Sequence, residues 1–119
     1  MPAYKHRFPK LDHQAVLSPM SGVTDVAFRT LCKRQGAGLT VTEFLSAAAI
    51  VRESEKTKKM LITDPCESPV AVQLFGGDEA EVVGAATSIQ NGFDVIDINC
   101  GCPAWKVVRN GSGAGEKTS

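Results

Sequence analysis

An amide and two thiols lie close together in the run 99–103, which reads Asn-Cys-Gly-Cys-Pro. The residues before it, Val95, Ile96 and Ile98, are apolar and β-branched and predict a strand buried in a parallel sheet. The amide and the thiols therefore stand where this strand leaves the core. Polar groups at the carboxyl ends of parallel strands build the ligand sites of many α/β folds, so we expect chemistry here.

Earlier stretches of the chain repeat this design of an apolar strand with a polar end. The strands are expected at residues 15–17, 39–44 and 70–75. The first runs into a turn that contains Pro19 and Gly22, the second carries Glu43 near its end, and the third is interrupted by the amide of Gln73. The repetition strengthens the interpretation of 99–103 as part of a site.

A helix is predicted after the first strand. Its apolar face is expected to hold Phe28, Leu31 and Cys32. Arg29 faces elsewhere in this prediction, Thr24 is the expected N-cap, and Gly36 is the expected C-terminal stop.

Two further helices are predicted between the later strands. One covers 47–60, begins at the cap Ser46, and has a charged second half that we interpret as a solvated face. The other begins at Asp78, which has capping-box spacing to Glu81, and stops at 91–92. Its apolar face is expected to hold Val82, Val83, Ala86 and Ile89.

Strands and helices thus alternate without a hairpin signal, which predicts an α/β fold with a parallel sheet covered by helices. The first strand is not followed by a G-x-G-x-x-G run, which disfavours a dinucleotide-binding Rossmann domain. Polar strand ends favour a parallel (β/α) barrel of the TIM type, of which about the first four βα units are present. We expect an N-terminal arm at 1–14 and a partial barrel domain at 15–119.

The composition is that of a soluble globular protein, with 43% hydrophobic and 22% charged residues. Thirteen cations balance thirteen anions, so a nucleic-acid partner would have to be bound by a local patch. We expect a cytoplasmic protein, because the first fifteen residues lack the apolar core of a signal peptide. The Cys-x-Cys pair lacks common zinc spacing, so we expect no metal and reduced, mostly buried thiols.

The ordered set of strand-end motifs resembles the tRNA-dihydrouridine synthases, from about residue 15 to residue 114. The motifs are Leu17-Ser-Pro-Met-Ser-Gly-Val-Thr-Asp25, Thr42-Glu43, Ala71-Val-Gln-Leu-Phe-Gly76 and Asp97-Ile-Asn-Cys-Gly-Cys-Pro103. The resemblance implies an FMN-binding (β/α)8 barrel followed by a helical domain. It also implies reduction of the 5,6 double bond of uridine in tRNA, with NADPH as the reductant.

The resemblance also implies roles for individual residues. Pro19 and Met20 would lie beside the flavin, Gln73 would hydrogen-bond its ring system, and Asn99 would lie where flavin and uracil meet. Cys102 matches the proton donor of the family, whereas Cys100 has no catalytic counterpart there. An unperturbed thiol has a pKa of roughly 8.5 and is mostly protonated near neutrality, which suits a proton donor.

Each role has a structural alternative. Cys102 could be a structural thiol before a proline turn, and Gln73 could satisfy a neighbouring backbone group. Lys106 and Arg109 could contact tRNA phosphates or be solvated loop cations. The alternative functions are a dihydroorotate dehydrogenase-like FMN barrel acting on a free pyrimidine, and a non-catalytic half-barrel.

The chain stops after the fourth predicted strand, whereas a complete barrel has eight strands and typically about 250 residues. We therefore expect the chain to lack the later loops that bind the FMN phosphate in the family, and the helical domain as well. We expect a truncated or fragmentary chain that self-associates through open barrel edges.

Overall fold

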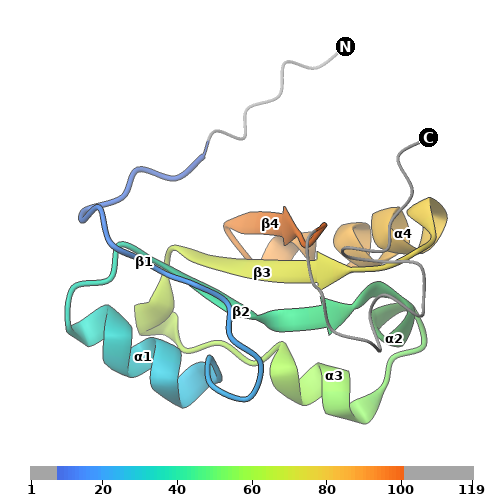
Figure 1. Ribbon diagram of the computed structural model, residues 1–119, viewed down its shortest axis with the longest axis horizontal. Helices are drawn as coiled ribbons and strands as arrows, with labels where there is room; N and C mark the ends of the chain where they lie inside the picture. Colours follow the sequence, from blue (N-terminus) through green and yellow to red (C-terminus); the bar gives the residue numbers. More distant parts are fainter. Residues whose placement is uncertain (1–7, 101–119) are drawn as a thin grey trace.

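Apolar, β-branched stretches form the strands of a parallel sheet, and helices alternate with them along the chain (Figure 1). The computed structural model describes residues 8–100. Its strands are β1 (Val16–Leu17), β2 (Leu39–Ser46), β3 (Val70–Phe75) and β4 (Val95–Ile98). Every neighbouring pair is parallel and the order is β1-β2-β3-β4, so each strand lies beside its neighbour in sequence. This order is that of a (β/α) barrel, which confirms the predicted partial barrel fold.

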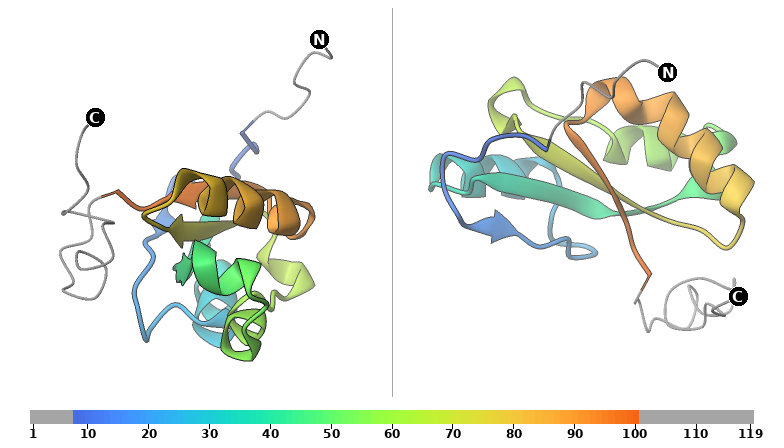
Figure 2. Two further views of the ribbon diagram at one scale, coloured as in Figure 1. Left: turned by 90° about the vertical axis from the view of Figure 1, so that its right-hand side faces the viewer. Right: turned by 90° about the horizontal axis from the view of Figure 1, so that it is seen from above.

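The helices occupy the connections between these strands. They are α1 (Val26–Arg34), α2 (Ala47–Val51), α3 (Glu55–Met60) and α4 (Glu79–Ile89), with short 3-10 turns η1 (Pro65–Glu67) and η2 (Gln90–Gly92). The described helices lie along one side of the sheet (Figure 2). The division into an arm at 1–14 and a barrel domain at 15–119 stays a prediction.

The two faces of the sheet differ because side chains alternate along each strand. Val72 and Leu74 of β3 point to the helices, where they pack with a buried cluster. That cluster also contains Leu45, Ala47, Ile50 and Ala85. Ala71 lies on the opposite face, in a smaller cluster with Leu39 and Val41. Gln73 therefore belongs to the face that a closed barrel would turn inward.

An extra residue in β2 changes which side chains reach that inner face. Val41 pairs with Ala71 and Phe44 with Gln73, so β2 advances by one residue more than β3 between these pairs. Such a bulge keeps Val41 and Phe44 on the same face. The Phe44 ring then meets the Phe75 ring edge-on, with their centroids 5.0 Å apart. β2 also continues to Ser46, two residues beyond the predicted end, because its last residues stay paired with β3.

Two of the three predicted helix N-caps are confirmed, and the third lies one residue away from the predicted position. The N-cap of α1 is Asp25, whose Oδ1 accepts a hydrogen bond from Phe28 N at 2.8 Å. The prediction of Thr24 was wrong by one residue, because the Thr24 side chain is buried and bonds to Met20. The predicted N-caps Ser46 and Asp78 are confirmed by hydrogen bonds to the first turns of α2 and α4.

Two helices end in the same hydrogen-bond pattern, with a left-handed residue after the last turn. The bonds are Gly36 N to Lys33 O and Ala37 N to Cys32 O for α1, and Glu53 N to Ile50 O and Ser54 N to Ala49 O for α2. The left-handed residues are Gly36 (φ 105°), as predicted, and Glu53 (φ 56°).

The prediction of one helix over 47–60 was wrong, because Glu53 ends α2 and Ser54 starts α3. The charged side chains of α3 are exposed, as predicted.

The face of α1 that turns inward differs from the predicted one at two residues, although Phe28 and Cys32 are half-buried. Arg29 is only 2% exposed, whereas Leu31 is 54% exposed. Burial of Arg29 is possible because its Nε lies 2.6 Å from Oε1 of Glu67, which is itself fully buried. The other guanidinium nitrogens donate to the carbonyl oxygens of Thr24 and Ile62. The ion pair thus joins α1 to η1, and a buried charge needs such a set of partners.

Two other apolar residues are more exposed than predicted. Ile98 is 44% exposed because β4 has β3 as its one strand neighbour in residues 8–100. Val83 is 58% exposed because α4 turns Ala85 toward the sheet instead. The remaining predicted residues of that helix face, Val82, Ala86 and Ile89, do pack on the core.

Candidate functional site at the strand ends

The loop after β1 is folded back onto the second half of β2. Met20 N donates to the Thr24 hydroxyl at 3.1 Å, and that hydroxyl lies 3.2 Å from the Met20 carbonyl oxygen. Gly22, with φ 75°, donates its N–H to Oε1 of Glu43 in a short hydrogen bond. Half-buried Pro19 and exposed Met20 are therefore held at the carboxyl edge of the sheet.

Side chains from the neighbouring strands β3 and β4 form a connected chain of hydrogen bonds. Nε2 of Gln73 donates to Oδ2 of Asp97 at 2.7 Å. Nδ2 of Asn99 donates to Oε1 of Gln73 at 3.2 Å. The partners of the Gln73 side chain are thus other side chains, and not the backbone group that the structural alternative required.

Register explains why these side chains meet. Gln73 pairs directly with Asp97 across the β3–β4 ladder. Asn99 is two residues further along and therefore on the same face. Its own N–H donates to the Leu74 carbonyl at 2.8 Å, which extends the ladder beyond the end of β4. The structure thereby brings together two of the predicted site residues, Gln73 and Asn99.

The remaining predicted site residues are Cys102, Lys106 and Arg109, and they lie outside the described residues. Cys100 is the last described residue and is exposed, with Sγ 3.8 Å from the Ile98 carbonyl oxygen. The chain therefore leaves the Gln73–Asn99 pair directly into the Cys-Gly-Cys-Pro run.

The described thiols are more exposed than predicted. Cys32 is half-buried, while Cys66 and Cys100 are exposed, and all three are free. A hydrogen bond with the Asp64 carboxylate raises the pKa of the Cys66 thiol. A raised pKa lowers the thiolate fraction, so Cys66 is not an activated nucleophile.

A cavity of about 450 Å³ opens at the carboxyl ends of β2 and β3. Its lining includes Ser46, Phe75, Gly76, Gly77, Asp78 and Glu81. Gly76 is required here, because a Cβ would lie 2.9 Å from Cγ2 of Val82 and 3.2 Å from Cβ of Ala47. The carboxylates of Asp78 and Glu81 repel anions, so this cavity does not suit a phosphate.

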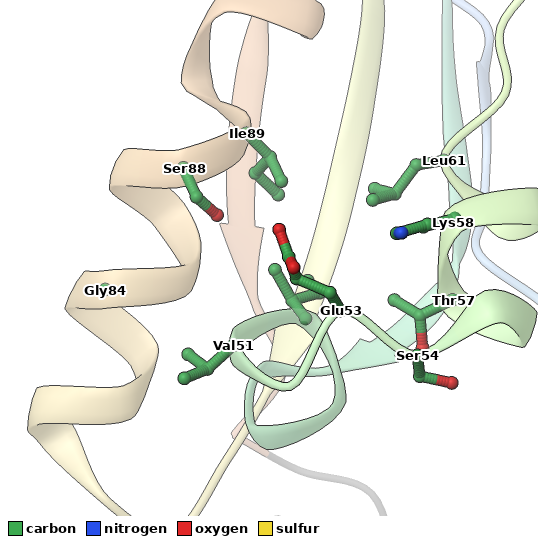
Figure 3. A pocket seen from close by; sticks show the side chains of 10 residues that line it. Val51, Glu53, Ser54, Thr57, Lys58, Leu61, Gly84, Ser88 and Ile89 are labelled. Carbon is green, nitrogen blue, oxygen red and sulfur yellow. The ribbon is translucent and has the colours of Figure 1, made fainter.

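A second cavity, of about 420 Å³, lies between α2, α3 and α4 (Figure 3). Its apolar lining comes from Ile50, Val51, Leu61 and Ile89. The side chains of Glu53 and Lys58 point toward it from its rim (Figure 3). This cavity is on the helix side of the sheet, so it is separate from the chain of hydrogen bonds at Gln73.

Sequence reasoning missed Asp97 as a member of the site. The sequence did contain a signal for it, because Asp97 is a charged residue in an apolar strand. It also precedes Asn99 by two residues and must lie on the same face of the sheet as Asn99. The partner of Asp97 was not predictable from spacing alone, since it depends on the β3–β4 register.

Among residues 8–100, no group of three or more His, Cys, Asp or Glu side chains is arranged to hold a metal ion. In the same part of the chain, every helix is too short or too polar to cross a membrane.

Comparison with known proteins identifies the family. Residues 16–115 match the family model described as dihydrouridine synthase. The tRNA-dihydrouridine synthase B of Pseudomonas aeruginosa is 42% identical over 105 residues, which cover 87% of this chain and 32% of that protein. The Escherichia coli K12 protein of the same name is 41% identical over 106 residues, covering 88% and 33%.

The chain spans about a third of the length of the curated relatives it matches. The family match itself covers most of the chain, including all of the described strands. The chain belongs to the dihydrouridine synthase family.

Proposed function

We propose that this chain supplies the flavin- and uridine-facing strand ends of an FMN-dependent tRNA-dihydrouridine synthase. The reaction is reduction of the 5,6 double bond of uridine in tRNA, with NADPH as reductant, in the cytoplasm. The observation that carries the proposal is the Gln73–Asn99 hydrogen bond, which leads directly into the Cys-Gly-Cys-Pro run. Family membership supplies the chemistry that such a site would perform.

The described residues suit the ring of FMN. A flavin ring has polar edges and broad apolar faces, so its site needs amide groups beside an apolar surface. The linked amides of Gln73 and Asn99 meet the first need. Pro19 and Met20, on the loop after β1, are proposed to meet the second. The carboxylate-lined cavity at the carboxyl ends of β2 and β3 does not suit the FMN phosphate, which this proposal assigns to later strands of the barrel.

FMN, when bound, supplies the hydride for the double bond of uridine. The other carbon of that bond needs a proton, and the Cys102 thiol is the proposed donor. Asn99 can hold a uracil edge without changing its own protonation state. Lys106 and Arg109 follow the Cys-Gly-Cys-Pro run and are proposed to contact tRNA phosphates.

A pair of matched thiol substitutions tests the chemical role. We expect Cys102→Ala to retain FMN and tRNA binding but to lose most uridine reduction, because the proton donor is removed. Cys100→Ala should lose much less. The assay uses a chimera in which residues 16–115 replace the matching segment of the P. aeruginosa relative. Equal losses from the two substitutions would refute the assignment of Cys102.

Self-association of the 119-residue chain is a further part of this proposal. In residues 8–100, β1 and β4 each have one strand neighbour, and open strand edges pair with other chains. We expect association at micromolar concentration, measured by size-exclusion chromatography, and little bound flavin by absorbance. Ile98→Lys, on the β4 edge, should weaken association, whereas Val83→Lys on exposed α4 should not. A monomer that carries stoichiometric FMN would contradict this.

A further inference from the structure

Asp97 is the end member of the hydrogen-bond chain at the strand ends. Its Oδ2 accepts from Nε2 of Gln73 at 2.7 Å, and Oε1 of Gln73 accepts from Nδ2 of Asn99 at 3.2 Å. Gln73 is 7% exposed, while Asp97 is exposed. A buried amide is thus held between one acceptor group and one donor group.

The chemistry of the carboxylate determines how the Gln73 amide is oriented. A carboxylate only accepts hydrogen bonds, so the Gln73 group facing Asp97 must be the NH₂ group. Rotating the amide by half a turn would place Oε1 against the Asp97 carboxylate and Nε2 against the Asn99 NH₂ group. The hydrogen bond to Asp97 would be lost and two oxygens would face each other, whereas the bond to Asn99 would survive only if the Asn99 amide also rotated. The orientation therefore depends on the charge of Asp97.

An amide NH₂ group carries two N–H donors, and Asp97 occupies one of them. The second N–H of Gln73 has no acceptor among residues 8–100. With its oxygen engaged by Asn99, Gln73 in this orientation offers a ligand a donor. A donor recognises a carbonyl oxygen or an unprotonated ring nitrogen.

We propose that Asp97 is a positioning residue that holds the Gln73 amide with its N–H toward the bound ring, so that Gln73 recognises an acceptor atom of that ring. The inference rests on the proposed function for the identity of the ring, and on the described geometry for the role of Asp97. Asp97 itself acts through Gln73.

The test replaces Asp97 by a residue of the same shape that lacks the charge. The Asn side chain in Asp97→Asn can donate or accept, so both orientations of the Gln73 amide become allowed. The matched control is Asp94→Asn, at the other end of β4. The Asp94 Oδ2 accepts from Val70 N at 2.9 Å, so the control changes a similar hydrogen bond that does not involve Gln73.

The first measurement is the side-chain NH₂ signal of Gln73 in the nitrogen-15 NMR spectrum, assigned by its loss in Gln73→Leu. We expect one of its protons to be shifted downfield by the carboxylate in the unmodified chain. Asp97→Asn should abolish this shift and Asp94→Asn should preserve it. A Gln73 signal that is the same in Asp97→Asn would overturn the proposal.

The second measurement is a double-mutant cycle on FMN affinity in the P. aeruginosa chimera, measured by quenching of flavin fluorescence. Asp97→Asn should weaken binding by at least about twofold, because with two equally populated orientations about half of the molecules would turn the Gln73 oxygen, and not its N–H, toward the ring. In the Gln73→Leu background the same substitution should have no further effect. Additive losses would overturn the proposal, because they would mean that Asp97 acts independently of Gln73.

The two measurements separate the two proposals. If no form of the chain, nor of the P. aeruginosa chimera, binds FMN, the proposed flavin function fails. The NMR comparison then still decides whether Asp97 orients Gln73.

Discussion

Two polar networks join distant parts of this chain, and they differ in how completely the protein satisfies them. The Arg29–Glu67 network is closed, since both side chains are almost fully buried and the guanidinium also donates to two backbone carbonyls. The Gln73 network is open at one end, because its Asp97 is exposed and the second Gln73 N–H lacks an acceptor in residues 8–100.

The difference separates a structural role from a binding role. A closed buried network has no group left for a ligand, and removing one member leaves an uncompensated charge. An open network at the carboxyl edge of a parallel sheet retains a donor that a ligand can use. We therefore expect mutations in the first network to act on stability and mutations in the second to act on binding.

The largest expected effect on stability is that of Glu67→Ala. The change leaves the Arg29 guanidinium buried without its counter-charge, which costs about 3–5 kcal/mol in the free energy of unfolding. It also removes the acceptor for Asp64 N. Urea denaturation monitored by circular dichroism measures the loss.

Glu55→Ala is the control for this prediction. Glu55 pairs with Lys58 at 3.4 Å, but both side chains are exposed, and such a pair contributes about 0.5 kcal/mol or less. Similar losses from Glu67→Ala and Glu55→Ala would show that the buried pair has no special structural role.

An intermediate effect is expected for Thr42→Val, at the bulge of β2. The Thr42 hydroxyl accepts from Gln73 N at 3.2 Å, at the point where the β2–β3 register shifts. Valine keeps the shape but leaves this N–H buried without an acceptor, which costs about 1–3 kcal/mol. Thermal or urea unfolding measures the loss.

Thr40→Val provides a matched control two residues earlier in β2. Thr40 is also fully buried, but its hydroxyl has no hydrogen-bond partner among residues 8–100. Its replacement should therefore be neutral or stabilising. A larger loss from Thr40→Val than from Thr42→Val would contradict the role assigned to the bulge.

The strand positions and the barrel order could be predicted from the sequence because apolar runs and turn residues are local signals. The predicted first and last residues of the third and fourth strands agree with those of β3 and β4. Helix faces were less predictable. Arg29 was assigned to solvent because the sequence does not show that Glu67, far along the chain, folds next to it.

Only part of the candidate site could be predicted from the sequence. Gln73 and Asn99 are amides in or directly after apolar strands, so the sequence and the family resemblance could identify them as site residues. Asp97 acquires its significance only through the parallel register that places it opposite Gln73. The end of α2 at Glu53 was also not predictable. A left-handed residue at a helix end is normally glycine, so a glutamate there gives no signal in the sequence that the helix stops.

A small effect on stability, but a large effect on binding, is expected for Gln73→Leu. Leucine has nearly the same size as glutamine. Asp97 loses its hydrogen bond to Gln73, but it is exposed and can bond to water instead. The free energy of unfolding should change by about 1 kcal/mol or less, whereas FMN affinity should fall at least about tenfold because a ring contact is lost. Leu74→Ala, on the helix face, should do the reverse and cost about 2–5 kcal/mol of stability without changing the affinity of the folded molecules. A large loss of stability from Gln73→Leu with unchanged flavin binding would assign Gln73 to the structural network instead.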